Sequence, residues 1–313
     1  MNRTRASWLF ASLVLCLGGC RTAPAPFEPV TAAVPEPPSP TVAGVTGTLR
    51  TLPTLASKHV ATRQVDVWLP PGYDTDTTRR YPVLYMHDGQ NLFDPKHTYA
   101  GIDWGVDEAM ARMIAAGEVR PAIVVAIWNS PKRFAEYMPQ KAVKGESVAT
   151  GVDVYPPVPA ADMLGDAYLR YLVEELKPAI DRDFRTLPGR DDTFVMGSSM
   201  GGLISLYAIA EYPQVFGGAG AISTHWPAGD GAMVDWFGAH LPNPRTHRLY
   251  LDHGTATLDA GYAPYQQRMD TALRKGGYRE NDNWISRVYP GAEHHERSWR
   301  ARIEVPLAFL LHP

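Results

Sequence analysis

Short apolar runs alternate with amphipathic segments through most of this 313-residue chain. Residues 82–86 and 122–128 are apolar throughout and of strand length, and residues 64–69 alternate polar with apolar side chains. These two patterns are typical of strands buried on both faces and on one face, respectively. Further strands are predicted in the second half of the chain, at residues 193–196, 216–222, 248–252 and 284–289.

The segments between these runs carry apolar residues at helical spacing. The helices predicted in this way cover residues 103–116, 162–182, 200–212, 262–275 and 298–311. Asp103 and Asp162 are predicted to cap the first two. Short strands that alternate with helices predict an α/β fold, with a mostly parallel central sheet and helices on both faces. Residues 141–161 contain several prolines and are predicted to form a long loop over the site.

The N-terminus has the pattern of an export signal. Arg3 and Arg5 precede an apolar run, residues 8–17, which is too short to span a bilayer as a mature helix. The run ends in Leu17-Gly18-Gly19-Cys20, which resembles a bacterial lipobox. Residues 1–20 are therefore predicted to be a lipoprotein-type signal peptide, with Cys20 as the lipidated residue. An ordinary secretory signal cleaved nearby is the alternative.

Residues 21–45 are rich in Pro and Ala and are predicted to form a disordered tether, so that residues 46–313 are the folded domain. The expected location is the bacterial cell envelope, with the domain anchored to a membrane and facing the periplasm. Both cysteines, Cys16 and Cys20, lie in the signal segment, so the mature domain has no disulfide and no thiol nucleophile. The net charge of −3, without a basic cluster, argues against a nucleic-acid partner.

The segment Gly197-Ser198-Ser199-Met200-Gly201 matches G-x-S-x-G between a predicted strand and a predicted helix. This layout places a serine on a tight turn, where its hydroxyl projects toward a base. Ser199 is the predicted nucleophile, and the N–H of Met200 is a predicted oxyanion donor. A glycine-rich turn without chemistry is the alternative.

A serine nucleophile needs a base and an acid that orients the base. His294 follows the last predicted strand and is preferred over its neighbour His295. Asp259 lies in the loop after the preceding strand, and Asp252, at the end of that strand, remains the alternative.

The loop that follows residues 82–86 is predicted to complete the oxyanion hole. Gly89 and Gln90 are the candidates for the second N–H donor besides Met200. His87 is expected to hold this loop by hydrogen bonds rather than to act as a base.

Several motifs together resemble the "Putative esterase" family, which includes esterase D, enterochelin esterases and feruloyl esterases. They are Tyr81-Pro82-Val83-Leu84-Tyr85-Met86-His87-Asp88-Gly89-Gln90-Asn91, Trp68-Leu69-Pro70-Pro71-Gly72-Tyr73, Trp128-Asn129-Ser130 with Arg133 and Glu136-Tyr137, the serine turn, and Gly291 to Trp299. The resemblance covers residues 60–312 and implies an α/β-hydrolase fold with Ser199, His294 and Asp259 as catalytic triad. The spacing from Gly254 to Asp259 is longer than the family's short Gly-x-x-Asp.

Polar and aromatic residues at predicted strand ends are candidates for substrate binding, namely Trp104, Trp128, Asn129, His225 and Trp226. Arg133 and Glu136 are expected to pair with each other, and a grip of Arg133 on an anionic substrate is the alternative.

The predicted function is a serine carboxylic-ester hydrolase that acts on a small-molecule or polysaccharide-linked ester, without cofactor or metal. The alternatives are an acyltransferase to a sugar or lipid acceptor, a non-catalytic envelope binding module, and a metal hydrolase. The last would be built on His87, His253, His294 and His295, which lack the spacing of a known ligand motif.

Overall fold

The computed structural model describes residues 45–313. The predicted signal segment with Cys20 and nearly all of the predicted tether therefore lie outside the described residues. None of the helices within residues 45–313 is long and apolar enough to cross a membrane.

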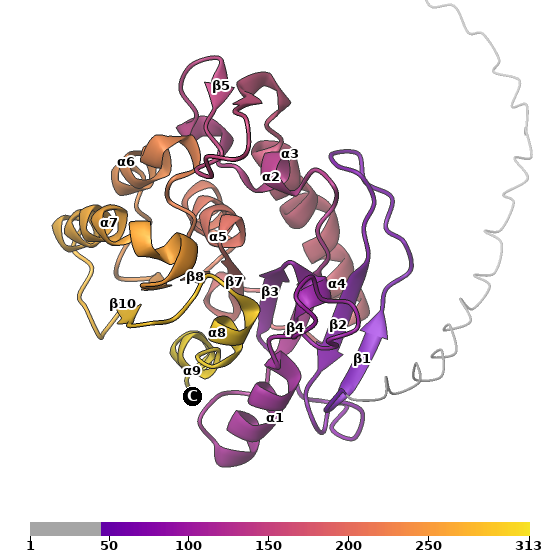
Figure 1. Ribbon diagram of the computed structural model, residues 1–313. Helices are drawn as coiled ribbons and strands as arrows, with labels where there is room; N and C mark the ends of the chain where they lie inside the picture. Colours follow the sequence, from indigo (N-terminus) through magenta and orange to yellow (C-terminus); the bar gives the residue numbers. More distant parts are fainter. Residues whose placement is uncertain (1–44) are drawn as a thin grey trace, which may run out of the picture. The chain divides into compact units, whose positions relative to one another are not determined.

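Residues 45–313 contain an eight-stranded sheet in the order β1-β2-β4-β3-β7-β8-β9-β10 (Figure 1). Only the contacts of β2 with β1 and β4 are antiparallel, and every other neighbouring pair is parallel. The strands are β1 (Thr48–Thr51), β2 (Val65–Leu69), β3 (Val83–His87), β4 (Ile123–Ile127), β7 (Thr193–Ser198), β8 (Gly218–Ile222), β9 (Arg248–Gly254) and β10 (Trp284–Tyr289). The predicted α/β fold with a mostly parallel sheet is confirmed.

Helices cover both faces of the sheet. Successive residues of each buried strand point to opposite faces, so both faces present apolar side chains to helices. Val83 and Tyr85 of β3 join one hydrophobic cluster, whereas Leu84 and Met86 join the other. The first cluster packs against α2 (Arg133–Tyr137), α3 (Gly165–Arg170), α4 (Lys177–Asp183), α5 (Met200–Glu211), α6 (Ala232–Ala239) and α7 (Ala263–Lys275). The second packs against α1 (Val106–Ala116), α8 (Glu296–Arg300) and α9 (Glu304–Leu311).

Helix boundaries differ from the prediction at several points. Asp103 and Asp162 do not cap their helices, because the N-cap residues of α1 and α3 are Gly105 and Leu164. Asp103 instead accepts a hydrogen bond from Arg300 at 2.6 Å. The predicted helix 162–182 is present as α3 and α4, which a π-helical stretch (Tyr171–Leu176) joins.

The predicted loop 141–161 contains a short pair of strands, β5 (Ser147–Val148) and β6 (Val158–Pro159). The main-chain carbonyl of Ala149 accepts a hydrogen bond from the N–H of Gly229, at the entry to α6. The segment is thus fastened to the core through its backbone.

Candidate active site

Ser199 occupies a strained turn between β7 and α5. Its backbone has φ 58° and ψ −124°, a conformation that non-glycine residues rarely adopt. A Cβ atom at Gly197 would lie 2.9 Å from the backbone of Gly201, and one at Gly202 would lie 2.7 Å from the Thr224 hydroxyl. The two glycines allow the close approach that this turn requires. In this conformation the Ser199 side chain points away from the strand, toward His294 in a loop at the carboxyl edge of the sheet.

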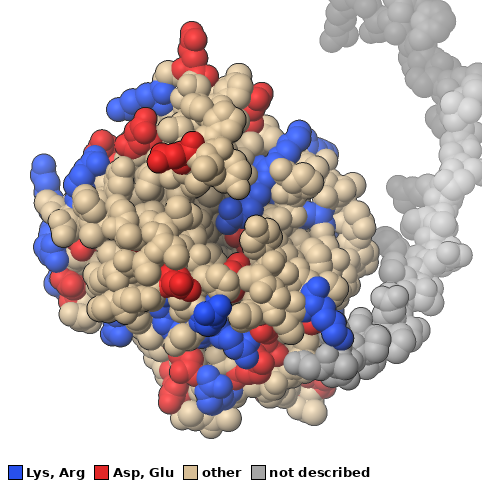
Figure 2. Space-filling model, viewed as in Figure 1, with Lys and Arg blue, Asp and Glu red and all other residues tan. Residues whose placement is uncertain are grey.

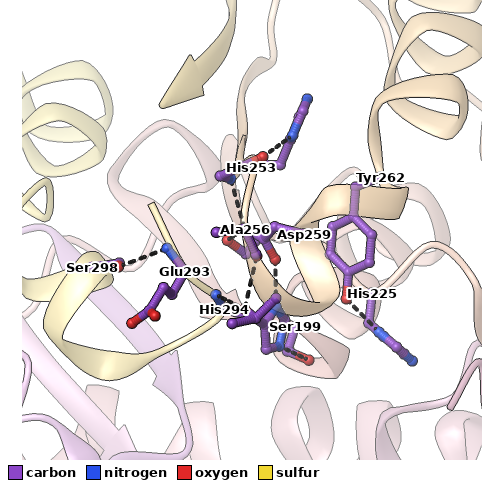
Figure 3. Close-up of polar contacts among 12 residues, drawn as sticks. Ser199, His225, His253, Ala256, Asp259, Tyr262, Glu293, His294 and Ser298 are labelled. Carbon is purple, nitrogen blue, oxygen red and sulfur yellow. Dashed lines mark hydrogen bonds and ion pairs between the residues drawn. The ribbon is translucent and has the colours of Figure 1, made fainter. Parts of the chain in front are cut away.

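Three side chains from separate loops form one hydrogen-bonded chain (Figure 3). His294 Nε2 lies 2.9 Å from Ser199 Oγ, and His294 Nδ1 lies 2.6 Å from Asp259 Oδ1. Asp259 belongs to a short 3-10 helix after β9, and His294 follows β10. The N–H of His294 donates to Thr257 Oγ1 at 2.7 Å, which ties the two loops together. The structure therefore brings together the three residues predicted as nucleophile, base and acid.

The Asp259 carboxylate is buried, and hydrogen bonds fix its orientation. Its Oδ2 atom accepts from the N–H of Gly254 at 2.6 Å and from the Ser223 hydroxyl at 2.5 Å. Burial acts to raise the pKa of Asp259, but His294, Ser223 and Gly254 hold that pKa below its usual value. An ionised carboxylate accepts only, so it keeps a proton on Nδ1 of His294 and leaves Nε2 free to accept the proton of Ser199.

The loop after β3 packs against the neighbouring strand beside Ser199. A Cβ atom at Gly89 would lie 2.5 Å from the backbone of Ala126, so this close approach requires glycine. Asp88 has φ 57°, and its carbonyl accepts the N–H of Asn91 at 2.9 Å. Gln90 lines the same cavity as Ser199. Met200, the other predicted oxyanion donor, is the first residue of α5, where N–H groups have no acceptor within the helix.

Arg133 fixes this loop through Asp88. Its Nε and Nη2 atoms each donate to the Asp88 carboxylate at 2.7 Å, and Asn129 Nδ2 donates at 2.6 Å. Burial acts to raise the pKa of Asp88, and the charge and hydrogen bonds of Arg133 lower it below its usual range. The predicted pairing of Arg133 with Glu136 is wrong. Glu136 pairs with Arg63 instead, at 2.7 and 2.8 Å, and both side chains are buried.

The alternative catalytic residues have other partners. His295 Nδ1 accepts the N–H of Arg297 at 3.1 Å and so caps α8. Asp252 forms a bidentate ion pair with Arg302, both contacts being 3.0 Å. His87 is fully buried beside the hydroxyl of Tyr168, 2.8 Å from its Nδ1, and burial lowers its pKa to about 3.

Metal-binding geometry is limited to one acidic cluster among residues 45–313, formed by Asp103, Asp107 and Glu108. Arg300 already donates to Asp103 and Glu108. Burial and the nearby Glu108 raise the pKa of Asp107 to about 7. Within the described residues, the histidines named for the alternative metal hydrolase do not form such a cluster.

A family comparison identifies the chain. The family described as "Putative esterase" matches residues 59–310. The chain belongs to this family. It is thus a carboxylic ester hydrolase with an α/β-hydrolase fold, as the motifs of the sequence predict.

Several known proteins align with most of the length of this esterase. The uncharacterized protein YbbA of Bacillus subtilis is 23% identical over 260 residues, which are 77% of this chain and 90% of YbbA. Among solved structures, the enterobactin esterase FES of Shigella flexneri, in the presence of enterobactin, is 19% identical with a TM-score of 0.62. That match covers 84% of this chain and 58% of FES. The ferulic acid esterase of Anaeromyces mucronatus, in complex with ferulic acid, is 20% identical with a TM-score of 0.57. That match covers 88% of this chain and 97% of the Anaeromyces esterase. At these identities the structural matches show a shared fold.

The cavity of the esterase at Ser199 has a volume of about 470 Å³, which is in the range of small-molecule sites. The face drawn in Figure 2 is hollowed near its centre, with basic and acidic side chains at the rim. Polar groups on the cavity wall include Asp88, Asn129, Arg133 and Glu296. The exposed ring of Tyr99 lies at the mouth.

Of the five residues predicted to bind substrate, Asn129 alone lines this cavity of the esterase. Trp104 and Trp226 are completely buried in the core, where Trp104 packs on Trp299 with ring centroids 5.4 Å apart. Trp128 donates through Nε1 to Asp66 at 2.7 Å and does not line the cavity. None of these three tryptophans therefore lies in the wall of the cavity at Ser199.

His225 lies behind the His294 ring rather than in the cavity. The ring centroids of the two histidines are 6.3 Å apart. The Nδ1 atom of His225 contacts the Tyr262 hydroxyl at 2.5 Å, and Nε2 contacts the Thr150 carbonyl at 2.8 Å. Burial lowers the pKa of His225 to about 4, so it is neutral at physiological pH. It connects the loop 141–161 to the wall behind His294.

Sequence reasoning missed the residues that hold Asp259 in place. They are Ser223, after β8, and Arg302, between α8 and α9. No local signal singles these two residues out, because Arg302 lies in a segment with other charged residues, Arg300 and Glu304 among them.

Proposed function

We propose that the esterase hydrolyses its ester by covalent catalysis at Ser199, with His294 as base and Asp259 as the acid that orients His294. The observation that carries this proposal is the hydrogen-bonded chain from Asp259 Oδ1 through His294 to Ser199 Oγ, at 2.6 and 2.9 Å. Distances of this kind are those that a nucleophile and its base require.

In the proposed mechanism, Ser199 Oγ attacks the carbonyl carbon while His294 Nε2 takes its proton. The negative charge on the carbonyl oxygen is stabilised by the N–H of Met200 and by that of Gln90 or Gly89. Collapse of this intermediate breaks the bond to the alcohol oxygen, which receives the proton from His294. Water then attacks the acyl carbon while His294 takes its proton. The bond from that carbon to Ser199 Oγ breaks, His294 returns the proton to Oγ, and the acid leaves.

The substrate proposed is a small-molecule or polysaccharide-linked ester. Its ester group would reach Ser199, and its polar part would contact the cavity wall at Asn129 and Glu296. The solved structures of similar fold support this class, since enterobactin is present in one and ferulic acid in the other.

The mechanism predicts that a fluorophosphonate probe labels the wild-type protein once per chain, at Ser199. The reason is that such probes phosphonylate a serine only when a base removes its proton. Mass spectrometry of the intact protein and of its peptides measures the added mass and its position. Absence of labelling, or labelling at another residue, contradicts the mechanism and favours a non-catalytic binding module.

We further propose that the protein is exported and held on the cell envelope by a lipid at Cys20. The support is the sequence of residues 1–20, with a charged start, a short apolar run and small residues before the cysteine. A single acyl chain binds membranes weakly, whereas a multiply acylated cysteine gives a stable anchor.

Changing Cys20→Ser is expected to move the esterase from the membrane fraction to the soluble fraction of bacterial cells. The serine cannot form the thioether on which lipidation starts. Fractionation followed by immunoblotting, with radiolabelled palmitate incorporation, measures both effects. Cys16→Ser is the matched control and should remain in the membrane fraction. Equal palmitate incorporation by the Cys20→Ser variant would exclude the anchor.

A further inference from the structure

A buried polar network lies directly behind Asp259. The Ser223 hydroxyl donates to Asp259 Oδ2 at 2.5 Å and accepts from Trp299 Nε1 at 3.1 Å and from Arg302 Nη2 at 2.8 Å. Arg302 in turn forms the bidentate pair with Asp252. These groups are all buried, so water does not screen the charges of the pair.

The hydrogen bonds fix the direction of the Ser223 hydroxyl. A hydroxyl has one proton and two acceptor positions. Because Trp299 and Arg302 can only donate here, they occupy both acceptor positions, and the proton must point to Asp259. Ser223 also has φ 41°, an unfavourable conformation for a serine, which its N–H bond to Asp252 Oδ1 at 3.0 Å supports.

The charge of Arg302 is balanced inside the network. Asp252 Oδ2 accepts from Nε of Arg302 and from the Tyr250 hydroxyl at 2.8 Å. The guanidinium is thus separated from Asp259 by a single hydroxyl, with a carboxylate on its other side. A change in either partner leaves one uncompensated charge close to the Asp259–His294 pair.

We propose that the Asp252–Arg302 ion pair is a positioning and charge-setting element of the active site, which acts on His294 through Ser223 and Asp259. The pair keeps Asp259 oriented as an acceptor for His294 and adds no net charge to its surroundings. This inference rests on the proposed function of Ser199, Asp259 and His294.

Other ionisable groups also face His294, and they are the same in every variant below. Asp88 and Arg133 line the cavity, His295 and Glu296 belong to the segment that follows His294, and His225 and Tyr262 lie behind the ring. Differences between variants therefore report the change at the ion pair itself.

The test is the pH dependence of kcat/KM for p-nitrophenyl acetate and of fluorophosphonate labelling, whose acid limbs report protonation of His294. Asp252→Asn leaves Arg302 positive and unpaired, which disfavours a charged imidazole, so the acid limb should move to lower pH by about half a unit or more. Arg302→Gln leaves Asp252 negative, so the limb should move to higher pH. The double variant should return it to within about 0.2 units of wild type.

Opposite shifts that cancel in the double variant support the charge-setting role, because a loosened structure would not change sign with the residue removed. If the acid limbs of the pH profiles are unchanged in the variants, or move equally and in one direction, the charge-setting role is overturned. If Arg302→Gln does not fold, a downward shift in Asp252→Asn and its reversal in the double variant still decide the question.

Glu136→Gln is the matched control. It breaks a second buried bidentate pair, with Arg63, whose hydrogen bonds do not reach the Asp259–His294–Ser199 chain. It should lower the melting temperature and leave the acid limb nearly in place. A wild-type protein that neither hydrolyses the ester nor takes the label overturns the proposed function as well, whereas labelling with unmoved limbs overturns only this inference.

Discussion

Ser199→Ala is expected to lower kcat/KM for p-nitrophenyl esters by about 10⁵-fold or more, because no acyl enzyme can form without the hydroxyl. The alanine keeps the Cβ atom, so the strained turn between β7 and α5 is preserved. Melting temperature and circular dichroism should therefore match the wild type. Steady-state assays at pH 7.5, with protein purified from cells that lack other esterases, measure the loss.

Ser198 provides the control for this prediction. It precedes Ser199 in the same motif but belongs to β7, and its backbone continues the sheet by pairing with Ile222. Ser198→Ala should keep activity within about tenfold of wild type, as expected for a substitution outside the reacting groups. If Ser198→Ala, rather than Ser199→Ala, abolishes turnover, the nucleophile is misassigned.

Local patterns in the sequence predicted the elements that lie nearest to Ser199. The strand before it and the helix after it follow from an apolar run, small residues in the turn and apolar helical spacing, all of which act over a few residues. The same reasoning failed at Asp103, whose carboxylate is engaged by Arg300, 197 residues away. A capping preference is a local property, and a tertiary ion pair outweighed it here.

The C-terminal helix shows where a usable local signal was overlooked. One helix was predicted over residues 298–311, but the structure has α8 and α9 with a turn between them. Pro306 has no N–H to donate to residue 302, so a continuous helix is unfavourable at this point. The turn also directs Arg302 inward to Asp252, a pairing that short-range patterns do not encode.

The choice between Asp252 and Asp259 needed the three-dimensional structure. Asp252 ends the predicted strand and Asp259 lies in the loop after it, which favours Asp259 but leaves Asp252 as an alternative. The partners that the two residues have elsewhere in the chain are different. Arg302 engages Asp252 from 50 residues away, and His294 engages Asp259 from 35 residues away. Similarly, Trp104 and Trp226 were predicted to bind substrate but are buried in the core, because large apolar rings gain most from burial.

Asp259→Asn is expected to reduce kcat by about 10³- to 10⁴-fold, through the orientation of the amide. Two donors, Gly254 N–H and the Ser223 hydroxyl, point at the Oδ2 position. They select the amide oxygen there and turn the NH₂ group toward His294 Nδ1. The imidazole then carries its proton on Nε2, so it cannot accept the proton of Ser199.

The contrast with Asp252→Asn makes this prediction specific. That variant keeps the acceptor at Asp259, so its kcat on the pH plateau should stay within about tenfold of wild type, even though its acid limb moves. Plateau kcat values of the two variants, measured in parallel with their melting temperatures, separate the roles. A larger loss of kcat in Asp252→Asn than in Asp259→Asn would transfer the orienting role to Asp252. Its carboxylate is held by Arg302 and Tyr250, with no histidine among its hydrogen-bond partners in residues 45–313, so such a result would require a rearranged site.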